Sequence, residues 1–450
     1  TRRSSDLSHN YNLDYIFSSA LTCTVIGTEK TSFRFCPVGF LYSNSGYGLF
    51  CNNEKTKYYL LGFMNSKIAA SLLKILSPSM GFESGYLRKL PLIESDSLDS
   101  IVERVKHCID GSNAEWDSFE ISWDFKKHPL LRNVSTISEA FTQWQSECDD
   151  RFNQLKANEE ELNRIFIDIY GLQDELTPEV EDKDVTVRKA DLQRDIKSLL
   201  SYAVGCMFGR YSLDVEGLAY AGGEWDSSKY QSYIPDADNV IPITDEEYLD
   251  DDIVSRLCAW LKAVYGADTL EANLDYIAKA LGNKGSTSRE IIRNYFLNDF
   301  FKDHCQTYSV TGSGKRPIYW LFDSGKQNGF KALVYLHRYT PDTIGNLRID
   351  YLHKMQRVYE SEINRMQDMM DHSENAREVA AASKRKDKLA KQLKECREYD
   401  EKISHLALSR IELDLDDGVK FNYRKLQTAQ DGKFYEVLAD SKNIMVKEKK

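Results

Sequence analysis

The most restrictive feature of the sequence is a long stretch, residues 347–410, that contains no glycine and no proline. Large apolar residues recur in it at intervals of three, four and seven, from Leu352 to Met370 and again from Leu389 to Leu406. This spacing is typical of helices that pack along a narrow apolar seam. Because the centre, residues 371–388, has few large apolar side chains, we predict an antiparallel coiled-coil hairpin over residues 347–412.

The remainder of the 450 residues is too long for a single further domain and predicts an α+β, multidomain protein. Short β-branched and aromatic runs followed by a helical stripe indicate a small α/β domain over residues 1–93. A charged connector follows over residues 94–135. We then expect an acidic, mainly helical domain (136–283), a small basic α/β region (284–346), the hairpin, and a C-terminal tail (413–450). Within the helical domain, Thr244 and Glu247 form a capping-box pattern that predicts a helix start.

Charge is distributed unevenly along the chain, although the formal net charge is −11. Residues 1–93 contain ten basic and five acidic residues, and residues 284–350 contain ten and six. Residues 136–283 contain 13 basic and 31 acidic residues. Two mildly basic regions therefore flank a strongly acidic one. Because the local field steers a polyanion, this pattern is compatible with DNA binding, but a solvated acidic surface without a partner explains it too.

Other sequence features indicate the class of protein. No run of about 18 apolar residues occurs, so we expect no membrane span. The nine cysteines are scattered, odd in number and without C-x-x-C spacing, so we expect neither a disulfide framework nor a structural zinc site, in a cytoplasmic protein. The sequence begins with Thr1 and a polar segment without methionine, which suggests a fragment of a longer protein.

Motifs of catalysis are missing from the sequence. The stretch 312–315 lacks the upstream glycine and the following Ser/Thr of a phosphate-binding loop. Glu181 and Lys183 match one half of a nuclease site, but a charged loop is the simpler interpretation. The nine prolines are never adjacent, which excludes the Asn/Asp-Pro-Pro-Tyr/Phe loop of adenine-N6 methyltransferases. We therefore expect no catalytic, cofactor-binding or metal-binding residue in this chain.

Several sequence blocks nevertheless resemble one family. Residues 59–67 (YLLGFMNSK) and 85–91 (GYLRKLP) resemble the specificity domain of TaqI-like adenine methyltransferases. Blocks at 116–120, 123–125, 201–214, 319–322, 336–339 and 414–420 resemble the PglX family of adenine-specific DNA methyltransferases, from bacterial BREX phage-defence systems. The chain resembles the C-terminal half of that family, without its N-terminal catalytic domain.

The resemblance implies a function for the whole chain. Residues 1–93 would be a target-recognition domain for double-stranded DNA. The N-terminal methyltransferase domain of the same protein would bind S-adenosyl-L-methionine and transfer the methyl group, so this chain alone is predicted to be inactive. Other BREX proteins would be further partners.

Recognition of a duplex needs cations for phosphates and polar groups for base edges. The basic residues of the two basic regions, with two polar residues of the turn near 85, are the candidates: Lys55, Lys57, Lys67, Ser84, Tyr86, Arg88, Lys89, Lys284, Arg289, Arg293, Lys315, Arg316, Lys326 and Lys331. For each, a solvated surface cation or a structural role is the competing interpretation.

Two alternative functions stay open at this point. The hairpin and the acidic region could dock other defence-system components as a scaffold, with incidental DNA contact. A weaker alternative is a nuclease that uses Glu181 and Lys183.

Overall fold

The computed structural model describes residues 12–24, 32–42, 46–76, 84–310 and 314–445. It divides the chain into two compact units. Unit 1 comprises residues 1–117 and 145–190, and unit 2 comprises residues 118–144 and 191–450. Both units combine helices with small antiparallel sheets, so the predicted α+β, multidomain class is confirmed. The finer division into six segments stays a prediction.

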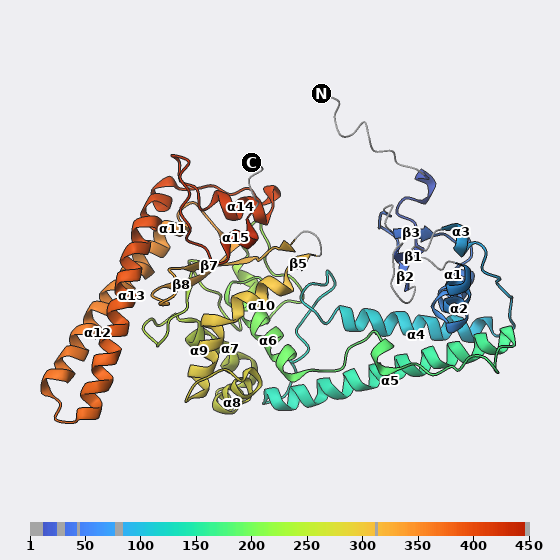
Figure 1. Ribbon diagram of the computed structural model, residues 1–450, viewed down its shortest axis with the longest axis horizontal. Helices are drawn as coiled ribbons and strands as arrows, with labels where there is room; N and C mark the ends of the chain where they lie inside the picture. Colours follow the sequence, from blue (N-terminus) through green and yellow to red (C-terminus); the bar gives the residue numbers. More distant parts are fainter. Residues whose placement is uncertain (1–11, 25–31, 43–45, 77–83, 311–313, 446–450) are drawn as a thin grey trace. The chain divides into compact units, whose positions relative to one another are not determined.

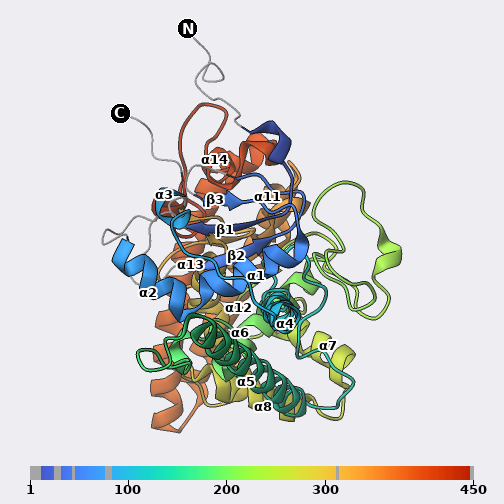
Figure 2. The same cartoon turned by 90° about the vertical axis from the view of Figure 1, so that its right-hand side faces the viewer.

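Unit 1 contains a three-stranded antiparallel sheet of order β2-β1-β3. Its strands are β1 (Ala20–Thr24), β2 (Phe33–Cys36) and β3 (Gly46–Leu49). The helices α1 (Glu54–Asn65), α2 (Lys67–Leu76), α3 (Ser84–Leu87) and α4 (Leu98–Trp116) follow. The long helix α5 (Ile137–Tyr170) contributes residues from 145 onward to this unit. Figure 2 shows α1 beside the sheet and next to α4.

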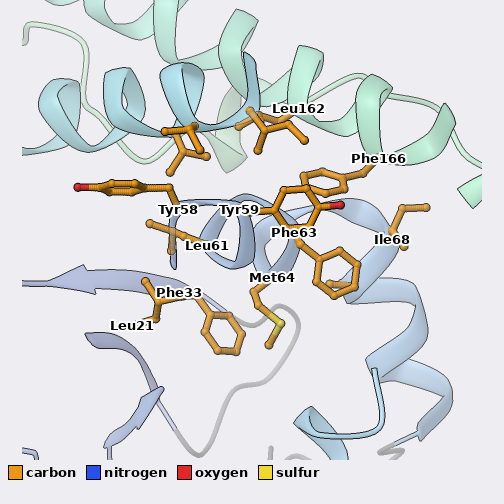
Figure 3. Packing of buried hydrophobic residues seen from close by; sticks show 14 of the residues in the cluster. Leu21, Phe33, Tyr58, Tyr59, Leu61, Phe63, Met64, Ile68, Leu162 and Phe166 are labelled. Carbon is orange, nitrogen blue, oxygen red and sulfur yellow. The ribbon is translucent and has the colours of Figure 1, made fainter. Parts of the chain in front are cut away.

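The core of unit 1 forms around α1. Leu21 and Phe33 reach it from the sheet, and Phe166 reaches it from α5 (Figure 3). Helix α1 lies so close to α4 that a Cβ atom on Gly62 would be 3.0 Å from a methyl group of Val105. Glycine at this position therefore permits the close helix packing that completes the core.

The Asn65-Ser66-Lys67 sequence at the junction of α1 and α2 is structural. The Asn65 side chain accepts a hydrogen bond from the Phe33 backbone N–H at 2.9 Å and donates one to the Phe33 carbonyl at 3.0 Å. The Ser66 hydroxyl donates to the Phe63 carbonyl at 2.6 Å. These bonds join the sheet to α1 and bend the chain into α2.

No single helix of the described ranges has the length and apolarity to span a bilayer. Helices α1 and α2 meet that criterion only as a pair bent by 68°.

Unit 2 is built from helices around a second small sheet. The helices are α6 (Leu192–Met207), α7 (Ile253–Tyr265), α8 (Leu270–Leu281), α9 (Ser288–Asn298) and α10 (Phe300–Thr307). The sheet has the order β4-β8-β7, from Ile241–Pro242, Lys331–Tyr335 and Tyr319–Asp323. A short ribbon pairs β5 (Ser309–Val310) with β6 (Gly314–Lys315). The chain ends with α14 (Val419–Lys425) and α15 (Ser441–Ile444).

Two long helices, α12 (His353–His372) and α13 (Ala376–Ser409), follow α11 (Thr343–Asn346) and a π-helix (Leu347–Leu352) in unit 2. They lie side by side and are joined by a short turn (Figure 1). Arg397 of α13 pairs with Glu360 of α12 at 2.7 Å, and Arg348 pairs with Asp400 at 2.6 Å. The turn falls within the segment that lacks large apolar residues, which explains why the chain reverses there.

The predicted helix start at Thr244 is wrong. The helix begins instead at Ile253, where the Asp252 side chain accepts a hydrogen bond from the Val254 N–H at 3.0 Å. Asp245 is engaged by Arg385 at 3.1 Å and Lys388 at 2.5 Å, both from α13. The Thr244 hydroxyl donates to the Asp252 side chain at 3.0 Å and its carbonyl accepts from Arg293 at 3.0 Å, so this threonine does not cap a helix.

Candidate nucleic-acid interface

The turn after α3 presents basic and aromatic side chains on unit 1. Its backbone is closed by hydrogen bonds from the Lys89 N–H to the Tyr86 carbonyl at 3.0 Å and from the Leu90 N–H to the Leu87 carbonyl at 3.4 Å. Leu87 and Leu90 pack against the core of the unit, which fixes the turn. Arg88 and Lys89 are exposed, and the Lys89 Nζ lies 5.7 Å from the centre of the Tyr86 ring. The predicted residue Ser84 begins α3 on the same segment.

The three lysines predicted on α1 and α2 have different environments. Lys55 is exposed and pairs with Asp99 at 2.7 Å. Lys67 is half-buried, and its backbone N–H donates to the Asn163 side chain at 2.9 Å. Lys57 is only 9% exposed and donates to the Ser19 hydroxyl at 3.0 Å. Because a phosphate cannot reach a buried ammonium group, Lys57 is removed from the candidate interface.

Two predicted cations of unit 2 are also buried. The Arg293 guanidinium forms a two-pronged ion pair with Asp252, whose side chain is completely buried. Lys331 is 8% exposed, donates to the Leu297 carbonyl at 2.9 Å and lies 3.5 Å from an Asp323 oxygen. Both side chains form interactions inside unit 2, so they too are removed from the list of candidate DNA-binding residues. Arg293 and Asp252 are 41 residues apart along the chain, whereas Lys331 lies opposite Asp323 in the β7–β8 hairpin.

The other predicted residues of unit 2 are accessible to different degrees. Lys284, Arg316 and Lys326 are exposed. Arg289 pairs with Glu271 at 2.6 Å, and Lys315 pairs with Asp440 at 2.6 Å. These five do not form a single cluster on one element.

Sequence reasoning missed a further cation beside the β5–β6 ribbon. A Cβ atom on Gly314 would lie 3.3 Å from the Lys420 Nζ, so Lys420 of α14 lies against the ribbon that carries Lys315. The sequence places these residues in different segments, and only the tertiary structure brings them together.

A pocket of about 360 Å³ in unit 2 also contains lysines. Lys302, Lys315 and Lys331 line it together with Asp323 and Asp440. Two of the lysines already form ion pairs with these aspartates. The pocket is therefore largely neutralised from within, which disfavours it as an anion site.

The described residues contain no cluster with the ligands of a metal site. None of their His, Cys, Asp and Glu side chains form a group of three or more able to hold a metal ion. Glu181 and Lys183 form an exposed ion pair with each other at 2.7 Å. A nuclease needs several carboxylates that converge on a phosphate, and this pair lacks them.

The sequence block at residues 201–214 builds the interior of unit 2. A Cβ atom on Gly205 would lie 2.4 Å from the Tyr211 ring, which stacks on Tyr202 with ring centres 4.9 Å apart. Burial raises the pKa of Glu120, which accepts a hydrogen bond from Ser201 at 2.7 Å. This block therefore contributes to packing inside unit 2.

Comparison with known proteins identifies two related methyltransferases. No protein-family model matches the sequence. The adenine-specific methyltransferase PglX of Lacticaseibacillus casei (strain Zhang) is 47% identical over 429 residues, which cover 93% of this chain and 35% of that protein. The adenine-specific methyltransferase BrxX of Escherichia coli O9:H4 (strain HS) is 35% identical over an alignment 463 positions long, which covers 96% of this chain and 37% of that protein.

The chain thus spans little more than a third of the length of the relatives that it matches. The similarity extends over both units, and it confirms the resemblance to PglX that the sequence blocks indicate. The chain is therefore homologous, over nearly its whole length, to a part of the adenine-specific methyltransferases PglX and BrxX.

Proposed function

We propose that this chain recognises and clamps target DNA for a site-specific adenine-N6 methyltransferase of a BREX phage-defence system. The methyl transfer from S-adenosyl-L-methionine takes place in a part of the protein outside this chain, and the protein acts in the cytoplasm. The observation that carries the proposal is the 47% identity to PglX over 93% of this chain. The sequence has no adjacent prolines and so lacks the proline loop of adenine methyltransferases, which supports a role other than catalysis for this chain.

The turn after α3 is the best-supported contact. Arg88 and Lys89 offer two positive charges to phosphates, and Tyr86 adds a polar hydroxyl that can reach a base edge. The turn is held by Leu87 and Leu90, so the backbone that carries these side chains is ordered before DNA arrives. A preordered site lowers the entropic cost of binding.

Replacing both cations of this turn with acids tests the proposal. We expect Arg88→Glu with Lys89→Glu to weaken duplex binding by about 10- to 100-fold at moderate salt. The slope of log affinity against log salt concentration should decrease in magnitude by about two, because about one phosphate contact is lost at each position. Fluorescence anisotropy with a labelled duplex over a series of salt concentrations measures both quantities.

The matched control changes the same total charge elsewhere. Lys391 and Lys402 are exposed on α13. Lys391→Glu with Lys402→Glu should leave the salt slope unchanged. Equal losses in the two double variants would show a nonspecific charge effect and would refute recognition by the turn.

The alternative scaffold function rests on the α12–α13 pair and predicts the opposite pattern. The α13 variant would then lose binding to other defence proteins, and the turn variant would behave as the unmodified protein. Co-purification of defence components with each variant distinguishes the two functions.

A further inference from the structure

Unit 1 carries a group of exposed apolar side chains, which we call the N-terminal apolar patch: Leu13, Tyr15, Phe17, Val38, Phe40 and Leu41. Leu13, Val38 and Leu41 are 64%, 72% and 68% exposed. Monomeric soluble proteins expose single apolar residues commonly but rarely gather many of them in one place, and such groups mark interaction sites.

The patch is a defined surface, because hydrogen bonds join its two segments. The Gly39 N–H donates to the Phe17 carbonyl at 2.9 Å, and the Tyr42 hydroxyl donates to the Ser18 carbonyl at 3.0 Å. The Tyr15 ring packs on Phe50, with ring centres 4.6 Å apart. The backbone of the two segments that carry these apolar side chains is therefore held together on unit 1.

The charge of the patch indicates what kind of partner it fits. Residues 12–18 and 37–42 contain one acidic residue, Asp14, and no lysine or arginine. A duplex surface requires cations, since affinity for DNA comes largely from neutralised phosphates. The patch therefore fits an apolar protein surface and not DNA.

The length of the relatives indicates which protein surface this is. PglX and BrxX extend over nearly three times the length that this chain matches. We propose that the N-terminal apolar patch docks against the portion of the methyltransferase polypeptide that lies outside this chain. The inference rests on the chain being part of a longer methyltransferase and does not require that this chain binds DNA.

Hydroxyl-radical footprinting of the longer protein that contains this chain tests the docking. The oxidation rates of Leu13, Phe17, Val38 and Leu41, each normalised to its intrinsic reactivity, should be several-fold below those of Ile75 and Leu408. These two controls are 77% and 81% exposed and lie outside the patch. Equal normalised rates in the patch and the controls would overturn the proposal.

Two further measurements identify the occupant. Protection that disappears on dilution, together with a dimer in sedimentation, would mean that a second copy covers the patch and would overturn the proposal. Protection that appears only when duplex is added would overturn it in favour of DNA. Protection in a monomer without DNA supports it, and this result stands whether or not the Arg88 and Lys89 variants affect DNA binding.

A pair of variants provides an independent test. Phe17→Ser with Leu41→Ser should expose new protease sites in the longer protein, because the two parts separate. Ile75→Ser should leave the cleavage pattern unchanged. An unchanged pattern in the patch variant would contradict the docking.

Discussion

Removing one negative charge from the interior of unit 2 by the substitution Asp252→Asn should lower the free energy of unfolding by about 3–5 kcal/mol. Asp252 is completely buried and pairs with Arg293 through both guanidinium nitrogens, one of them at 2.9 Å. Asparagine retains the shape and the helix-capping ability of aspartate. The substitution therefore isolates the effect of leaving the Arg293 charge buried without its counterion.

Helix α9 provides a control for this prediction. Arg289, on the same helix, forms a similar pair with Glu271, but there the side chains are 42% and 66% exposed. Exposed pairs contribute little because water and salt screen them. Glu271→Gln should therefore change the free energy of unfolding far less, as measured by urea denaturation. Equal effects of the two substitutions would show that burial of the Arg293 charge does not determine stability here.

Acidification should destabilise unit 2 through two buried histidines. Burial lowers the pKa of His128 to about 3 and the pKa of His304 to about 3. The unfolded chain therefore binds more protons than the folded one below pH 6.5, and stability falls as the pH decreases from there. At pH 5 the loss should be about 2 kcal/mol for each histidine.

Denaturation at a series of pH values measures this loss. The His304 Nε2 accepts hydrogen bonds from the backbone N–H groups of Ile318 and Tyr319, both at 3.0 Å, and a glutamine oxygen can replace it as an acceptor. His304→Gln should therefore reduce the pH dependence between pH 6.5 and 5. His372→Gln is the control, since this histidine is exposed and Asp368 raises its pKa. A pH dependence that is unchanged in His304→Gln would show that burial of His304 does not cause the loss of stability at low pH.

The sequence predicts those parts of the fold that depend on local pattern. The apolar spacing of residues 347–410 indicates the long helices α12 and α13, because helix periodicity is a property of neighbouring residues. The capping pattern at Thr244 fails because the Thr244 hydroxyl donates to the Asp252 side chain at 3.0 Å and the Thr244 carbonyl accepts a hydrogen bond from Arg293, 49 residues away, at 3.0 Å. Local rules cannot anticipate competition from distant partners.

The same limitation explains why cations that are buried in the structure were among the predicted DNA-binding residues. Composition identifies Lys57, Arg293 and Lys331 as cations but does not indicate that each is buried. Lys57 and Arg293 are buried beside Ser19 and Asp252, which lie 38 and 41 residues away, and Lys331 is buried on β8 opposite Asp323 of β7. Arg88 and Lys89 remain accessible, while Leu87 and Leu90 pack against the core on either side of them.

The affinity of the unmodified protein for duplex DNA over a range of salt concentrations tests the proposed function most directly. DNA recognition by this chain predicts measurable binding at low salt and a steep linear decrease of log affinity with log salt concentration. The magnitude of this slope should be about 0.9 for each phosphate contacted. Binding that is absent at low salt, or that does not respond to salt, would contradict it.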